Sequence, residues 1–141
     1  MQTFQEFLGS PKLYHGSARK FKKGKVEPSR RGSLGPGVYL TPDKSLAKMY
    51  GQNIYKFGFN GKILNVHALD QGKRMWHDDS DNNWEAAQAY AKQNGYIGIF
   101  AIISAKPPVE PTFVTTPEQL HALNKKFREV QAVVFDPKDL A

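Results

Sequence analysis

Apolar residues recur along this chain in short runs separated by polar turn residues, which predicts several strands and a few helices. Alternating or continuous apolar runs predict strands over 12–15, 38–40, 54–59, 62–66, 96–103 and 130–135. Helical spacing predicts helices over 41–50, 84–94 and 117–128, after a short N-terminal helix capped by Thr3. Because strands and helices do not alternate regularly, we expect an α+β domain with largely antiparallel sheets.

Turn and capping residues mark where these elements begin and end. Thr41, followed by a proline, predicts a helix whose N-cap is Thr41. Thr116 with Gln119 predicts a capping box at the start of the last helix. The pair Asn60–Gly61 is the strongest short signal for a β-hairpin, so the strands on either side of it are expected to pair.

Length and charge narrow the picture further. The chain has 141 residues, 40% of them hydrophobic, which predicts one folded domain over 1–141. The formal net charge is +7, and much of the excess lies between Lys12 and Arg31. That stretch is either a solvated basic loop or a surface that attracts the phosphates of a dinucleotide or of a larger substrate.

Several classes of protein are excluded or disfavoured by what the sequence lacks. The absence of cysteine excludes disulfides, thiolate metal sites and cysteine nucleophiles. No apolar run approaches the ~20 residues that span a bilayer, and the first residues lack the features of a signal peptide, so we expect a cytoplasmic protein with no membrane partner. The His and Asp residues of 77–81 match no common metal-binding spacing, so no metal site is predicted.

Polar and aromatic residues gather in four pieces of sequence at predicted strand ends. His15 stands beside Gly16, where the missing side chain lets another group approach the backbone closely. A glycine-rich turn leads into Tyr39, and Tyr50 follows eleven residues later. The pieces are Leu13–Ser17, 35–39 with its interval to Tyr50, 94–99 and 133–137.

In this order, the pieces resemble the ADP-ribosyltransferase superfamily, on the His-Tyr-Glu branch shared by diphtheria toxin and the poly-ADP-ribose polymerases. The resemblance spans nearly the whole chain. It implies an ADP-ribosyltransferase-like fold, in which two small and mainly antiparallel β-sheets are flanked by a few short helices. It also implies that NAD is the co-substrate and that the bond between nicotinamide and ribose is cleaved.

The same resemblance assigns roles to individual residues. It implies that the backbone of Gly16 binds the nicotinamide carboxamide and that Tyr39 and Tyr50 sandwich its ring, a stacking worth roughly 0.5–1.5 kcal/mol per aromatic pair. His15 would then bind a ribose hydroxyl near the adenosine end, with Ser17 as an additional polar contact. Candidates for the NAD pyrophosphate are Arg30, Arg19 and Arg31.

The chain departs from the family pattern on its last predicted strand. The position that holds the catalytic glutamate in the family is Gln131, which forms hydrogen bonds but carries no charge. Glu129 lies two residues earlier and would point to the same face of a strand. A bulge would let Glu129 supply the missing carboxylate, or it would act at the acceptor. Active transfer, slow transfer and binding without transfer all stay open.

These residues lead to one expected function and two alternatives. We expect an NAD-dependent mono-ADP-ribosyltransferase that modifies a protein acceptor and releases nicotinamide, with His15, Tyr39, Gln131 and Glu129 as catalytic candidates. The first alternative keeps the chemistry but takes a nucleic acid as the acceptor. The second is a non-catalytic module that binds NAD or ADP-ribose. The small size would suit an effector in the cytoplasm of a bacterial or infected host cell.

Overall fold

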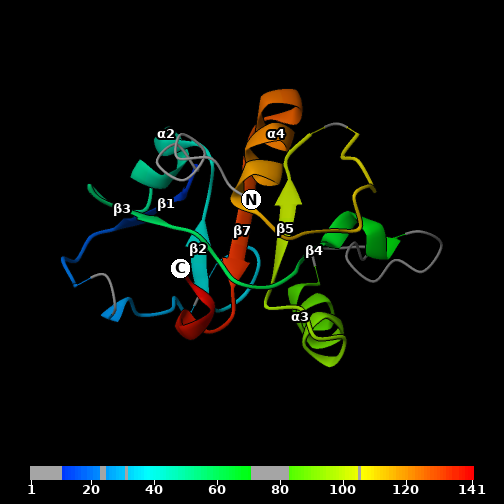
Figure 1. The fold of residues 1–141 in the computed structure, drawn as a ribbon, viewed down its shortest axis with the longest axis horizontal. Helices are drawn as coiled ribbons and strands as arrows, with labels where there is room; N and C mark the ends of the chain where they lie inside the picture. Colours follow the sequence, from blue (N-terminus) through cyan, green and yellow to red (C-terminus); the bar gives the residue numbers. More distant parts are fainter. Residues whose placement is uncertain (1–10, 23–24, 31, 71–82, 105) are drawn as a thin grey trace, which may run out of the picture.

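The protein has an α+β fold, here in a computed structural model that describes residues 11–22, 25–30, 32–70, 83–104 and 106–141 (Figure 1). The described strands and α-helices are β1 (Leu13–Ser17), β2 (Val38–Leu40), α2 (Lys44–Lys48), β3 (Asn53–Phe57), β4 (Ile63–Asn65), α3 (Trp84–Gln93), β5 (Gly98–Ile102), β6 (Phe113–Val114), α4 (Pro117–Phe127) and β7 (Val130–Val134). Short 3-10 helices follow β4 and β7. The expected α+β class is confirmed.

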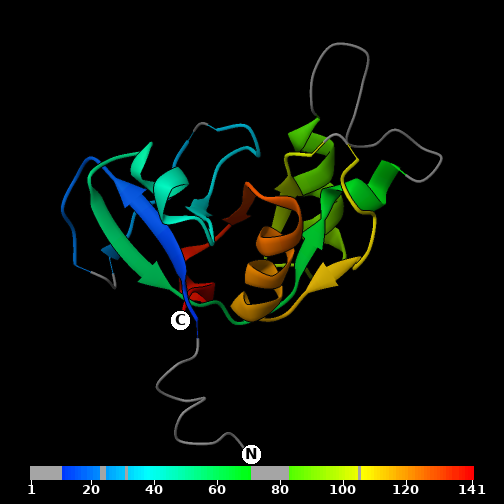
Figure 2. The ribbon, with the colours of Figure 1, turned by 90° about the horizontal axis from the view of Figure 1, so that it is seen from above.

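The strands form two sheets. The larger has five strands in the order β2-β7-β5-β4-β6, and the smaller pairs β1 with β3. All described pairs are antiparallel except β4 with β5, which is parallel. The smaller sheet lies to one side of the larger one (Figure 2). A bridge between Tyr14 and Thr41 joins β1 to the end of β2.

The predicted hairpin at Asn60–Gly61 is wrong. The strands on its two sides exist, but β3 pairs with β1 whereas β4 pairs with β5 and β6. The backbone beside the turn is bound elsewhere: the Asn60 N–H donates to the Asp139 carbonyl, and the Lys62 carbonyl accepts from the Ile97 N–H. The turn therefore carries the chain from one sheet to the other.

The five-stranded sheet separates two hydrophobic clusters. Alternate residues of β5 and β7 point to opposite faces. Phe100 and Val134 belong to the cluster that includes Leu120 of α4, whereas Ile99 and Val133 belong to the cluster that includes residues of α3. Tyr39 lies opposite Val133 in the β2–β7 register and joins the α3 cluster.

The first predicted helix starts later than expected. Its N-cap is Asp43, whose carboxylate accepts from the N–H groups of Ser45 and Leu46. Thr41 is not the cap, because its hydroxyl donates to the Val130 carbonyl and its backbone pairs with Tyr14. Pairing with the sheet outweighs the local preference of a Thr-Pro sequence for a helix start.

The other described helices match their predictions. Asn83 caps α3, and Thr116 with Gln119 forms the capping box of α4. The predicted N-terminal helix and the 77–81 cluster lie outside the described residues, and β6 was not predicted. Within the described part of the chain, none of the helices has the length and apolar character needed to cross a bilayer.

Candidate functional site

Tyr39 is fixed at the hydroxyl end of its side chain by two hydrogen bonds. Its hydroxyl donates to the Gly35 carbonyl at 2.6 Å and accepts from the Leu34 N–H at 2.9 Å. Burial raises the pKa of Tyr39 to about 12, so the phenol is neutral at physiological pH. Gln88 of α3 donates to the Leu34 carbonyl and thereby ties the same loop to the helix. The loop and the aromatic ring therefore form one braced unit.

His15 is held by the main chain of β2. Its Nδ1 lies 2.7 Å from the Tyr39 carbonyl oxygen. A carbonyl only accepts hydrogen bonds, so Nδ1 is the donor, and Nε2 of the neutral ring is an acceptor. Burial lowers the pKa of His15, and the bond to the Tyr39 carbonyl offsets part of that shift. The imidazole is therefore suited to accept a hydrogen bond from a hydroxyl group.

Gly16 lies where β1 and β2 part from each other. The Tyr14–Thr41 bridge has hydrogen bonds in both directions, and the next pair in that register would be Gly16 with Tyr39. The Tyr39 carbonyl accepts from His15 instead. Since alternate residues of a strand direct their backbone groups to opposite edges, the N–H and carbonyl of Gly16 face the same side as those of Tyr14, away from β3.

A second contact makes Gly16 necessary. A Cβ at this position would lie 1.8 Å from the Ala47 carbonyl oxygen of α2. The absent side chain therefore lets α2 pack closely on β1. That packing sets the position of Tyr50, which follows α2 in the chain and is 47% exposed.

Gln131 connects β7 to two segments that lie outside the sheets. It shares a face of β7 with Val133, two residues away, and so lies on the Tyr39 side of the sheet. Its Nε2 donates to the Tyr50 hydroxyl, and its Oε1 accepts from the Ser33 hydroxyl at 3.2 Å. The side chain is 92% buried, with 8% exposed. Both ends of the amide are therefore engaged within the protein.

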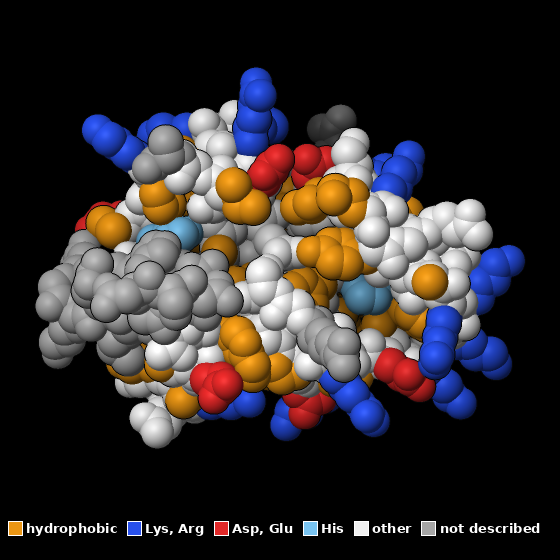
Figure 3. Space-filling view, turned by 180° about the vertical axis from the view of Figure 1, so that it is seen from behind, with side chains coloured by type: hydrophobic (Ala, Val, Ile, Leu, Met, Phe, Trp, Pro, Cys, Tyr) orange, Lys and Arg blue, Asp and Glu red, His pale blue; other side chains and the backbone are white. Residues whose placement is uncertain are grey.

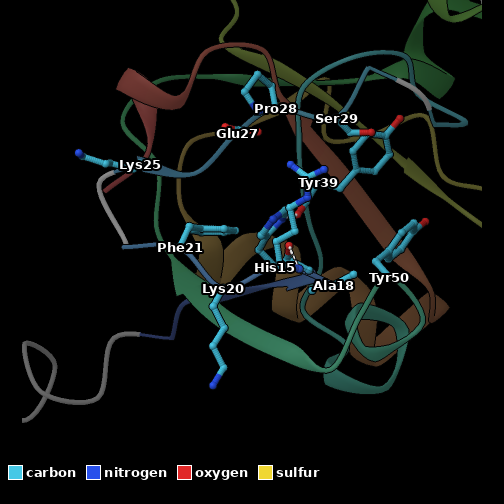
Figure 4. A pocket seen from close by; sticks show the side chains of 13 residues that line it. His15, Ala18, Lys20, Phe21, Lys25, Glu27, Pro28, Ser29, Tyr39 and Tyr50 are labelled. Carbon is cyan, nitrogen blue, oxygen red and sulfur yellow. Dashed lines mark hydrogen bonds between the residues drawn. The ribbon is translucent and has the colours of Figure 1, made fainter.

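The side chains of His15, Tyr39 and Tyr50 border a cavity of about 500 Å³ (Figure 4). Tyr39 and Tyr50 lie together at one end of it, and Phe21 lies at the other. Phe21 stacks on Tyr55 of β3, with ring centroids 4.2 Å apart. The volume is within the usual range for sites that bind small molecules and cofactors.

The rim of the cavity is mainly basic. Arg19, Lys20 and Lys25 line it, with Glu27 as its acidic residue. The amino groups of Lys20 and Lys25 extend outward from the hollow (Figure 4). Such a rim attracts anions that approach the opening.

Comparisons with protein-family models, with curated proteins and with solved structures found no match to this chain.

The structure brings together most of the residues that the sequence singled out. His15, Gly16, Ser17, Tyr39 and Tyr50 all line the main cavity. Gln131 borders a small adjoining space of about 10 Å³, which it shares with Gly16, Tyr39 and Tyr50.

Two candidates lie elsewhere. Arg30 does not line this cavity but a neighbouring hollow, so among the three arginines considered for a pyrophosphate the cavity contains Arg19. Arg31 lies outside the described residues. Glu129 precedes β7, is exposed and has a φ of 51°. The strand alternation that predicts a shared face with Gln131 therefore stops at Val130, and Glu129 lines neither space.

Two contributors to the site were missed by sequence reasoning. Ser33 lies in the glycine-rich turn before Tyr39, and its hydroxyl donates to Gln131 across 98 positions of sequence. Phe21 lies in the basic stretch between Lys12 and Arg31, where the sequence carries no local signal that its ring stacks on Tyr55.

The slot between the two tyrosine rings is narrow. Their centroids are 6.1 Å apart and the rings are tilted by 37°. A third ring stacked between them needs roughly 7 Å, because each layer of carbon contacts takes about 3.5 Å. A planar ligand would therefore have to widen the slot by about 1 Å and bring the rings closer to parallel.

Proposed function

We propose that this protein is an NAD-dependent mono-ADP-ribosyltransferase that cleaves the nicotinamide–ribose bond and transfers ADP-ribose to a macromolecule. The proposal is carried by one observation: Gly16, Tyr39, Tyr50 and Gln131 meet at one end of a cavity with a basic rim. The order and spacing of these residues in the sequence resemble the His-Tyr-Glu branch of the ADP-ribosyltransferase superfamily. The observed α+β arrangement is compatible with the fold of that superfamily.

The nicotinamide end has matching partners in the slot. A carboxamide has one donor group and one acceptor, and the backbone of Gly16 offers the complementary pair at an edge turned away from β3. The rings of Tyr39 and Tyr50 would close on the two faces of nicotinamide once the slot widens. Tyr50 is half-exposed at the end of a short helix, so it is the wall with freedom to move.

The rest of the dinucleotide would extend along the cavity. The Nε2 atom of neutral His15 would accept a hydrogen bond from a ribose hydroxyl. Arg19 on the rim is the candidate to bind the pyrophosphate, with Lys20 and Lys25 contributing long-range attraction from their outward positions. This replaces Arg30 as the preferred pyrophosphate ligand.

The proposed reaction breaks the bond between nicotinamide N1 and ribose C1′, and the electron pair leaves with nicotinamide. The acceptor atom then forms a new bond to C1′ and loses its proton. The ribose passes through a cation-like transition state, which a carboxylate at position 131 would stabilise. Gln131 binds the ribose 2′-hydroxyl without supplying charge, and losing that charge costs on the order of 2–4 kcal/mol of transition-state stabilisation. We therefore expect slow transfer.

A second candidate function is binding of NAD or ADP-ribose without transfer. The observation in its favour is that both ends of the Gln131 amide are already bound, to Ser33 and to Tyr50. Glu129 would contribute a carboxylate to the reaction after a rearrangement of the chain before β7, or it would act on the acceptor.

Release of nicotinamide from NAD by the purified protein separates these two functions. A Tyr50→Ala variant tests the site in both cases, since it removes one wall of the slot. We expect it to abolish the rise in Tm that NAD produces in the wild-type protein. Tyr90→Ala is a matched control, because Tyr90 is an exposed tyrosine on α3 outside the cavity. An unchanged NAD effect in Tyr50→Ala would refute the placement of nicotinamide.

A further inference from the structure

A second hollow, of about 480 Å³, adjoins the main cavity. Residues 27–29 form a wall common to both. The other walls of the second hollow come from Arg30, from the turn at Pro36, from Lys92 near the end of α3 and from Phe135 after β7. Ser29 and Gly37 bind each other through two backbone hydrogen bonds of 2.8 and 2.9 Å, so the common wall is anchored to β2.

The second hollow combines positive charge with an aromatic surface. Arg30 and Lys92 are exposed cations, and Phe135 is half-buried. The Lys92 Nζ lies 5.0 Å from the centre of the Phe135 ring, so a cation and an aromatic face lie in direct contact. Glu27 is the acidic residue of the lining, which leaves an excess of positive charge.

We propose that this hollow binds single-stranded nucleic acid. Each nucleotide carries a phosphate and a base with a flat aromatic face. In proteins that bind single-stranded nucleic acid, cationic side chains bind the phosphates and aromatic side chains stack on the bases. A phosphate that pairs with Arg30 and Lys92 would draw the lysine from above Phe135, and a base would stack in its place. The volume suits one nucleotide of the strand, and the remaining nucleotides would follow the surface outside.

An acidic peptide is the competing occupant, and the aromatic residue favours the nucleic acid. Carboxylates would pair with Arg30 and Lys92, but they would leave the face of Phe135 without a stacking partner. Binding in this hollow is measured without NAD and is therefore independent of NAD chemistry. If transfer is established as well, the common wall would place the bound strand beside the main cavity.

The test is fluorescence anisotropy with a labelled single-stranded oligonucleotide of about 12 nucleotides. We expect Phe135→Leu, which keeps an apolar side chain but removes the ring, to weaken binding by about 5- to 150-fold. Affinity falls as salt rises, and we expect the double variant Arg30→Ala/Lys92→Ala to make the negative slope of log affinity against log salt shallower by about 1.4, as the loss of two phosphate contacts to a single strand requires.

A charge-matched control is essential, since Lys and Arg side chains are spread around the face shown in Figure 3. Lys125→Ala/Lys126→Ala removes the same charge from exposed positions on α4, and we expect it to leave affinity nearly unchanged. Equal losses in both double variants would overturn the proposal in favour of diffuse attraction. Binding of an acidic peptide that depends on Arg30 and Lys92, together with oligonucleotide binding that is indifferent to Phe135, would assign the hollow to an acidic protein.

If Phe135→Leu fails to fold, Phe135→Tyr supplies the aromatic test, because it keeps the ring and should retain binding. The exposed Arg30 and Lys92 pair carries the charge test independently of that result.

Discussion

Placing a carboxylate on the last strand with Gln131→Glu tests the proposed role of position 131 most directly. The substitution changes an amide to a carboxylate of nearly the same shape. The two present partners are hydroxyl groups, on Ser33 and Tyr50, and both are able to donate to a carboxylate oxygen after rotating. We therefore expect the variant to fold with the same arrangement of side chains.

The size of the effect follows from the charge and its surroundings. The side chain at position 131 is 8% exposed, so water screens an introduced charge weakly. A stabilisation of roughly 2–4 kcal/mol of the cation-like transition state corresponds to an increase of about 30- to 900-fold in nicotinamide release. Burial of the charge disfavours folding, but hydrogen bonds from two hydroxyls, worth about 1.5–3 kcal/mol each to a charged group, offset that cost.

The assay is the rate of nicotinamide release at saturating NAD, with NAD binding checked by the rise in Tm. Gln93→Glu adds the same charge at the exposed end of α3 and should leave the rate unchanged. Gln131→Met removes the hydrogen bonds without adding charge and should not raise the rate. If Gln131→Glu folds and binds NAD but releases nicotinamide no faster than wild type, position 131 does not face the reacting ribose.

Three further predictions concern folding and binding. Because folding lowers the pKa of His15, the unfolded chain binds more protons than the folded protein as pH falls through about 6.5. The Tm of the wild-type protein should therefore fall on acidification, and the Tm of His15→Gln should fall less. Equal dependence of Tm on pH in the two proteins, measured in a pH series of thermal melts, would contradict this. Tyr39→Phe leaves two buried backbone groups without their partner and should cost about 1–3 kcal/mol in urea unfolding, while the NAD effect on Tm persists because the ring remains. Gly16→Ala should cost about 1–3 kcal/mol through overpacking against Ala47 and weaken the NAD effect as well, and a fully stable variant would show that α2 yields easily.

Local signals predicted the described elements well where the surrounding structure agrees with them. The capping box at Thr116 and the cap at Asn83 satisfy backbone donors of their own helices, so the sequence nearby is sufficient. The predictions at Thr41 and Asn60–Gly61 were wrong because contacts with residues distant in sequence determine the local structure there. The Val130 carbonyl accepts a hydrogen bond from the Thr41 hydroxyl, and the Asp139 carbonyl accepts one from the Asn60 N–H.

The sequence predicted which residues form the candidate site but not the hydrogen bonds that connect them. The order of His15, Tyr39 and Tyr50 was informative because the motifs have characteristic intervals. The bond from Ser33 to Gln131 was not, since no local pattern relates a turn residue to a strand 98 positions away. The face that Glu129 shares with Gln131 in a regular strand is not assured, because Glu129 precedes β7 and has left-handed backbone, to which strand alternation does not apply.

The two walls of the slot between Tyr39 and Tyr50 come from different parts of the fold. Tyr39 and Gln131 stand on the five-stranded sheet, whereas Tyr50 follows α2, which packs on β1 and β3. Between them lies the Tyr14–Thr41 bridge, beyond which the strands separate. The two sides of the slot are therefore joined to each other at that bridge. A ligand that widens the slot must also distort the contact between the two sheets. A variant in which that contact deforms more easily would therefore bind the ligand more tightly, even if every residue in contact with the ligand stayed the same.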